Sequence, residues 1–196
     1  VDGGRNTDRN RGMVITDRYD HVIDDKNRLA IPSSIRGAMD PESDGTAFYL
    51  VPEGRYLQLI PEKLFQKLAV QATAGLALSP EAAKVRRLVF AMASRLDWDK
   101  QGRVIIPDRF MLDGKNPDPF GGTMLGREVT LVGANDRIEL WNRADFLNHM
   151  RELLTDRSSL QRAMEKMFGD PPAHTIAPTP AWVEAATADR PRRPRH

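Results

Sequence analysis

Two short stretches of the chain carry acidic and basic side chains at the same spacing. Residues 24–32 read DDKNRLAIP, and residues 99–107 read DKQGRVIIP. In each, an Asp lies four residues before an Arg, an Asn or Gly directly precedes that Arg, and apolar residues ending in Pro follow. Arg28 and Arg103 lie 75 positions apart. The chain therefore contains an internal repeat whose most polar part reads as a turn.

A guanidinium that a carboxylate holds on a turn is preorganised to meet a phosphate group or the edge of a guanine base. We expect Asp24 and Asp99 to position the turns and the residues around the arginines to contact DNA. The predicted DNA-binding residues are Lys26, Asn27, Arg28, Lys100 and Arg103. The sequence leaves open whether the second turn also contacts DNA or only completes the fold.

The alternative chemistry for Asp24 and Asp99 is a pair of carboxylates that share one proton. Each Asp has its own Arg four residues on, which favours the ionised carboxylate and disfavours proton sharing. The four His residues are scattered and show no metal-ligand spacing. The sequence has no phosphate-binding Gly loop and no nucleophile elbow. We therefore predict no enzyme, no metal ion and no cofactor.

Composition restricts how such a chain could bind DNA. The chain has 196 residues, of which 40% are hydrophobic, and it has no Cys, as is usual in a reducing cytoplasm. No apolar run is long enough for a membrane span. The net charge of +2 comes from residues 1–12 and 170–196, and the part between them is neutral. A neutral core needs a local basic patch to bind DNA, and several copies of that patch would strengthen the binding.

Turn signals and alternating apolar residues predict the same elements in both repeats. In the first, a hairpin around residues 24–27 is followed by a short helix and by strands over 48–51 and 56–60. In the second, the later strands fall at 128–132 and 138–141, and the offset between the repeats is there 81 instead of 75. The difference places a net insertion of six residues within the Gly- and Pro-rich stretch 113–126.

These patterns predict an α+β fold that is mainly β, with two tandem repeats joined by helices. The expected segments are a disordered extension over 1–12, repeat 1 over 13–65, a helical linker over 66–93, repeat 2 over 94–146, a C-terminal helix over 147–169 and a disordered Pro- and Arg-rich tail over 170–196.

The order of these motifs resembles the MraZ family, bacterial transcriptional regulators with two tandem SpoVT-AbrB domains. The resemblance spans about residues 13–154. Besides the two Asp and Arg stretches, it is carried by residues 48–52 (FYLVP), 131–133 (LVG) and 138–141 (IELW). It implies a double-split, swapped-hairpin β-barrel with helices around it, and chains that associate into a ring.

The resemblance also implies a function. Members of the family regulate the cell-division and cell-wall gene cluster and bind short G-rich direct repeats in its promoter, which places them in the cytoplasm at the nucleoid. The family's basic hairpin corresponds here to Lys26 and Arg28, with Asp24 as the positioning partner. The second copy corresponds to Asp99, Lys100 and Arg103.

Three features depart from the family pattern. Asn27 stands where the family has Gly, the loop over 113–126 is long, and both ends carry extensions. The first bears on the geometry of the turn, and the others bear on ring size and partner contacts. The remaining alternative function is an AbrB-like oligomeric scaffold or antitoxin whose partner is a protein that docks on the helical linker or on the tail.

Overall fold

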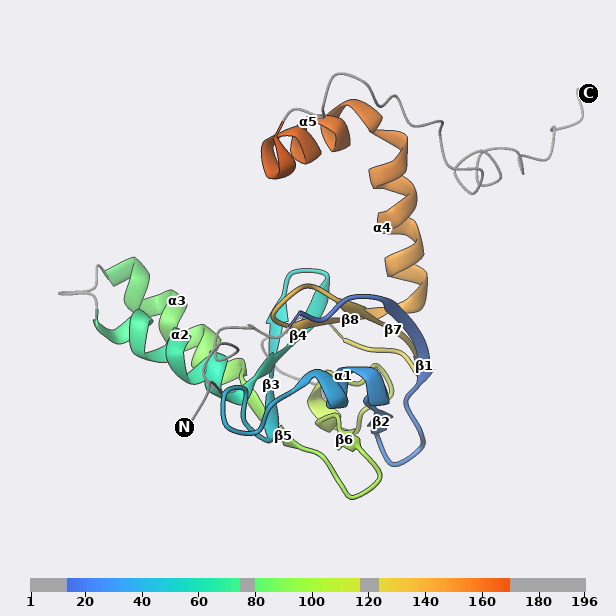
Figure 1. Ribbon diagram of the computed structural model, residues 1–196. Coiled ribbons are helices and arrows are strands. Elements are labelled where there is room, and N and C mark those ends of the chain that lie inside the picture. Colours follow the sequence, from blue (N-terminus) through green and yellow to red (C-terminus); the bar gives the residue numbers. More distant parts are fainter. Residues whose placement is uncertain (1–13, 75–79, 117–123, 170–196) are drawn as a thin grey trace, which may run out of the picture. The chain divides into compact units, whose positions relative to one another are not determined.

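The computed structural model describes residues 14–74, 80–116 and 124–169, so the predictions for the two ends of the chain lie outside the described residues (Figure 1). The described part combines helices with antiparallel strands and confirms the α+β class. The strands are β1 (Arg18–Val22), β2 (Arg28–Ala30), β3 (Ala47–Glu53), β4 (Tyr56–Pro61), β5 (Ser94–Asp97), β6 (Arg103–Ile105), β7 (Glu128–Gly133) and β8 (Ile138–Asn142). The helices are α1 (Ser33–Ala38), α2 (Glu62–Ala74), α3 (Pro80–Met92), the 3-10 helix η1 (Asp108–Phe110), α4 (Arg143–Thr155) and α5 (Arg157–Phe168).

The two repeats exchange strands. A 6-stranded antiparallel sheet has the order β1-β7-β8-β4-β3-β5, so β1 of the first repeat pairs with β7 of the second, and β5 of the second pairs with β3 of the first. A separate 2-stranded ladder joins β2 to β6. Strand pairing among the described residues thus remains split between two sheets, as expected for swapped hairpins.

The strand register shows that the two repeats are related by a pseudo-twofold axis. In the small ladder Leu29 pairs with Val104, its equivalent 75 positions on. In the large sheet Gln58 pairs with Glu139, its equivalent 81 positions on. A residue can face its own equivalent only on a twofold axis, so the axis passes through both pairs. The two offsets predicted from the sequence are therefore the offsets of the structure.

One hydrophobic core fills the space between the sheets. Its members come from both repeats and include Leu29 and Val104 of the ladder together with Phe48, Leu57, Leu131 and Leu140 of the large sheet. Each of these six side chains is fully buried. Because the ladder contributes its inward face to this core, it is fixed to the sheet, although no strand pairing in the described ranges connects the two.

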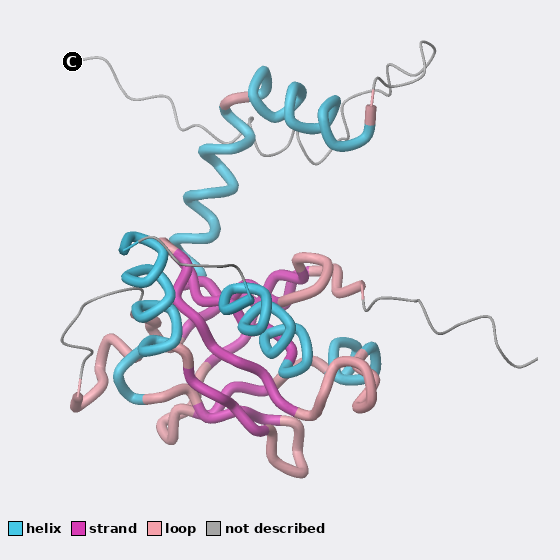
Figure 2. The backbone as a smooth tube through the Cα atoms, turned by 90° about the vertical axis from the view of Figure 1, so that its left-hand side faces the viewer, coloured by secondary structure: helices cyan, strands magenta, loops and turns pink. Residues whose placement is uncertain are grey.

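Helices α2 and α3 lie between the repeats in sequence and in front of the strands in Figure 2. A second, smaller apolar cluster fixes them, in which the ring of Phe65 stacks on that of Tyr49 at 4.1 Å and meets that of Phe90 edge to face at 5.9 Å. Helix α2 begins at Glu62, since Pro61 still belongs to β4 and is paired with Phe48.

The chain divides into two compact units, residues 1–149 and 150–196. Where one helix over 147–169 was predicted, α4 starts earlier, at Arg143, and α5 follows after Asp156. The carboxylate of Asp156 accepts the N–H of Ser159 at 3.1 Å, which caps α5 and separates it from α4. Within the described ranges, no helix is long and apolar enough to cross a membrane.

The axis of the ladder offers a matched test of this packing. Leu29→Ala removes a fully buried side chain shared by both repeats, and we expect a loss of about 2–5 kcal/mol in the free energy of unfolding. Ile105→Ala changes the outward face of the same ladder, where Ile105 is 63% exposed, and should cost less than about 1 kcal/mol. Urea unfolding at one fixed protein concentration measures both, and equal losses would contradict the assignment of inner and outer faces.

Candidate nucleic-acid interface

In the first turn, the carboxylate of Asp24 organises the four residues that follow it. Its Oδ1 atom accepts the backbone N–H groups of Lys26 and Arg28, both at 2.9 Å. Its Oδ2 atom accepts Nε–H of Arg28 at 2.7 Å. The backbone closes the turn with N–H of Asn27 donating to the Asp24 carbonyl at 2.9 Å. The Asp24 side chain therefore fixes both the path of the backbone and the Nε end of the Arg28 guanidinium.

The second turn repeats this bonding atom for atom. Oδ1 of Asp99 accepts N–H of Gln101 at 2.8 Å and of Arg103 at 3.0 Å, and Oδ2 accepts Nε–H of Arg103 at 2.9 Å. One contact is added, from Nη2 of Arg103 to the same Oδ2 at 2.6 Å. Each aspartate thus bonds both to its turn's backbone and to the guanidinium of its own arginine.

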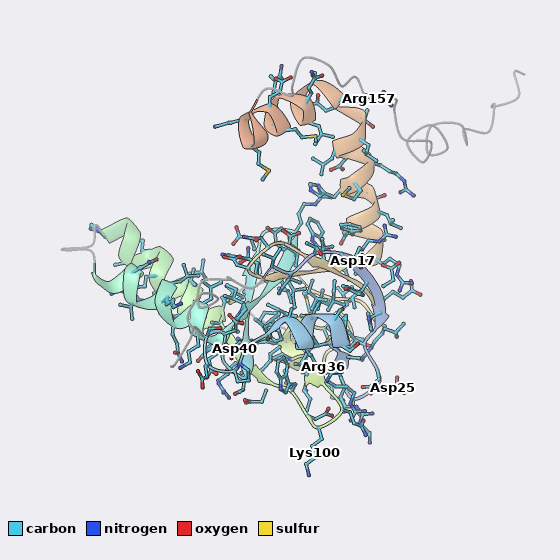
Figure 3. All side chains as sticks on the ribbon, in the orientation of Figure 1. Asp17, Asp25, Arg36, Asp40, Lys100 and Arg157 are labelled. Atoms are coloured by element: carbon cyan, nitrogen blue, oxygen red, sulfur yellow. The ribbon has the colours of Figure 1, made fainter. Side chains whose placement is uncertain are left out.

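The turns are also tied to each other. N–H of Ile31 donates to the Gly102 carbonyl at 2.9 Å, and N–H of Ile106 donates to the Asn27 carbonyl at 2.8 Å. Asn27 and Gly102 both have left-handed backbones, with φ of 58° and 74°. These equivalent, reciprocal bonds extend the ladder beyond its strands, and the two turns therefore project at the same end of the molecule, where Figure 3 labels Asp25 and Lys100.

Side-chain exposure distinguishes the predicted DNA-binding residues. Lys26 and Lys100 at the tips are exposed, whereas the side chains of Arg28 and Arg103 are 31% and 28% exposed. Within the described residues, no hydrogen bond engages the terminal nitrogens of Arg28, but one terminal nitrogen of Arg103 is held by Asp99. The structure thus brings the four basic residues to one end and leaves Arg28 with the more available guanidinium.

Both carboxylates are stabilised in the ionised form. The backbone N–H and the guanidinium of Arg28 lower the pKa of Asp24. The guanidinium and then the backbone N–H of Arg103 lower the pKa of Asp99 to about 2. Each aspartate is therefore paired with its own arginine, which is the opposite of a proton-sharing dyad. Among the residues that the structure describes, no group of three or more side chains could hold a metal ion.

Asn27 differs from the other predicted contacts because its side chain is bound by a residue of the other repeat. Its Oδ1 atom accepts Nη1–H of Arg127 at 2.9 Å. The second turn is backed differently: a Cβ atom on Gly102 would overlap the guanidinium of Arg36, which donates from Nε to the Ile31 carbonyl at 3.1 Å. Sequence reasoning identified neither arginine. Arg127 directly follows the predicted insertion, and that position was the one available signal.

The chain is similar in sequence to known proteins. A family model described as "MraZ protein, putative antitoxin-like" matches residues 89–170. The Transcriptional regulator MraZ of Thermomicrobium roseum is 30% identical over 151 residues, which are 77% of this chain and 97% of that protein. The protein of the same name from Pediococcus pentosaceus is 34% identical over 141 residues, 68% of this chain and 85% of that protein.

The chain belongs to the MraZ family. The resemblance noted from the paired Asp and Arg motifs is thereby confirmed. The MraZ family model covers the second repeat and helices α4 and α5, whereas the match to the Thermomicrobium roseum protein extends over most of both chains. A third MraZ protein, from Roseiflexus castenholzii, is 32% identical over 132 residues, 66% of this chain and 82% of its own.

The lowered pKa of Asp99 predicts how stability depends on pH. A carboxylate whose folded pKa is depressed stabilises the fold above its unfolded pKa, here 3.8, and loses that contribution as pH falls toward the folded value of about 2. We expect the difference in unfolding free energy between the wild type and Asp99→Asn to be constant from pH 7 to about pH 5 and to shrink below about pH 4. Urea unfolding across this range measures it, and a difference that grows on acidification would contradict the ion pair.

Proposed function

We propose that the chain is a sequence-specific DNA-binding transcriptional regulator that reads DNA with the paired turns. The observation that carries this proposal is the duplicated turn: two Asp-held arginines with the same hydrogen bonds, tied into one ladder, on a core without net charge. An ion-paired arginine is fixed in place before DNA arrives, so less side-chain entropy is lost when it binds.

The ladder is a two-stranded antiparallel ribbon that presents two arginines on its outward face, which supports a role in reading DNA. The major groove of B-DNA admits a two-stranded β-ribbon. Leu29 and Val104 face the core, whereas the outward face pairs Arg28 with Ile105 and Arg103 with Ala30. A guanidinium can donate two hydrogen bonds to the O6 and N7 atoms of guanine, and apolar side chains can pack against the methyl group of thymine. Arg28 is the primary base-reading residue in this proposal, with Lys26 and Lys100 on the phosphates.

One ladder presents few cations, so the proposal includes avidity. Each chain binds one short G-rich repeat weakly, and a ring of chains spans several direct repeats of a promoter at once. The cell-division and cell-wall gene cluster as target, and a cytoplasmic, nucleoid-associated location, come from the resemblance to the MraZ family. Support from this chain is the absence of net charge over residues 13–169, which favours binding through many copies over binding through a single polycationic surface.

A second candidate function is an oligomeric scaffold or antitoxin that acts through a protein partner. The observation in its favour is the wording "antitoxin-like" in the description of the matching family. The two functions separate in one experiment, because an antitoxin acting through protein contacts would not depend on the terminal nitrogens of Arg28.

Arg28→Ala tests the reading role. We expect about a 5- to 150-fold loss of affinity for a duplex with G-rich direct repeats, the range for one bidentate contact to a base. Arg162→Ala, an exposed arginine of α5, is the control and should leave affinity unchanged. Band shifts over a range of salt concentrations measure both variants. Unchanged affinity and salt slope in Arg28→Ala would remove the role given to this residue.

Avidity is tested by the number of repeats in the DNA. We expect duplexes with several correctly spaced repeats to bind about 10²- to 10⁴-fold more tightly than a duplex with one, because later contacts form within one complex. Native mass measurement should show assemblies of several 22.0 kDa chains. A mass of one chain with and without DNA, together with equal affinity for both duplexes, would contradict the ring.

A further inference from the structure

We propose that Arg127 is a positioning residue for DNA recognition: from the second repeat, it holds the reading turn of the first repeat in its binding conformation. The inference rests on the proposed function of that turn. Arg127 directly precedes β7, and its guanidinium reaches the turn that precedes β2. The two segments lie about one hundred residues apart in the sequence, so the contact between them is made only by the fold.

Arg127 contacts the turn at three points. Its Nη1 atom donates to the carbonyl oxygen of Asp24 at 2.7 Å and to Oδ1 of Asn27 at 2.9 Å. Its own carbonyl accepts N–H of Ile23, the residue before Asp24, at 2.8 Å. The start and the end of the turn are thereby fixed to one residue of the other repeat.

Asp113 completes this arrangement by holding the guanidinium from its other side. It accepts Nε–H of Arg127 at 2.8 Å and lies 2.7 Å from Nη2. All three guanidinium nitrogens are therefore engaged within the protein. Because its donors are already used, Arg127 is poorly suited to bind a phosphate. Arg28 differs, since no hydrogen bond among the described residues engages its terminal nitrogens.

Arg127, held by Asp113, acts as a brace for the first turn. This brace offsets a conformational cost that only the first turn has. Asn27 adopts φ of 58°, in the left-handed region where a side chain is disfavoured and Gly is not. Gly102 occupies the equivalent position of the second turn and needs no such help. The bond from Arg127 to Oδ1 of Asn27 fixes the side chain and keeps the backbone in this region. This contact engages the side-chain Oδ1 of Asn27 within the protein and leaves Lys26 and Arg28 for DNA.

The positioning role predicts that the effects of Arg127 and Asn27 are coupled. Arg127→Ala should weaken binding to direct-repeat DNA about 5- to 20-fold and leave the salt slope unchanged, because no phosphate contact is lost. In the Asn27→Gly background the same change should cost less than about 2-fold, because Gly adopts the left-handed conformation unaided. The matched control is Arg137→Ala, which removes an arginine of similar exposure, 27% against 32%, that pairs with Asp136 away from the turn; it should bind like the wild type.

A readout without DNA separates positioning from general loss of stability. The backbone amide of residue 27 donates to the Asp24 carbonyl. Its protection against hydrogen exchange, relative to the unfolded chain of the same variant, should fall in Arg127→Ala and should return toward the wild-type value in Arg127→Ala with Asn27→Gly. Amides of the ladder core, such as that of Leu29, should be unchanged in both.

The outcomes distinguish this inference from the function on which it rests. Equal loss of affinity in both backgrounds, or a salt slope reduced by about one in Arg127→Ala, would overturn the positioning role, the second by making Arg127 a phosphate contact. Full affinity in Arg127→Ala with reduced affinity in Arg28→Ala would overturn the brace alone. Full affinity in Arg28→Ala would instead overturn the proposed function.

Discussion

The exchange of strands between the repeats is the constraint on which the other features depend. Neither repeat can satisfy its own backbone, since β1 finds its partner in β7 and β5 finds its partner in β3. The inward faces of both repeats also fill one hydrophobic core, and the two halves must therefore fold together. The ladder of β2 and β6 follows from this exchange, and it brings two turns that are 75 residues apart to one end of the molecule. The candidate interface is a product of the exchange and belongs to neither repeat alone.

The chemistry of the turns uses one charge in two ways. The carboxylates of Asp24 and Asp99 accept backbone N–H groups as well as guanidinium N–H groups, so each shapes its turn and orients its arginine. An exposed ion pair contributes little to stability on its own. Its value here is geometric, because a fixed guanidinium needs less ordering when it meets a rigid, planar acceptor.

Most of the fold could be predicted from the sequence because it depends on periodic patterns and on the repeat. The offsets of 75 and 81 agree with the strand register, since loops absorb insertions that strands cannot. Helix starts were less predictable. A Pro is typical of a helix start, but Pro61 pairs in β4. Helix α1 follows Pro32 without a side-chain cap, although Ser is a favoured capping residue and Ser33 and Ser34 are at hand. In both places tertiary packing outweighed the local signal.

The candidate site shows the same division. Asp24 and Arg28 are four residues apart, so their pairing could be anticipated, and the backbone conformation of Asn27 follows from its place in a turn. The partner of the Asn27 side chain could not be anticipated, because Arg127 arrives through the strand exchange. Residues that come together only through the strand exchange have no characteristic separation in the sequence, so their contact cannot be predicted from spacing.

The pseudo-twofold axis has a further consequence for how such a protein can diverge. In a homodimer of single repeats every residue on the axis meets its own copy, and both reading turns must be identical. Fusion into one chain removes that restriction: Gln58 faces Glu139 across the axis, where two glutamates would repel each other. It also permits an Asn held by Arg127 in one turn and a Gly packed against Arg36 in the other. A duplicated, fused chain can thus assign its two halves different tasks, which a symmetric pair of identical subunits cannot do.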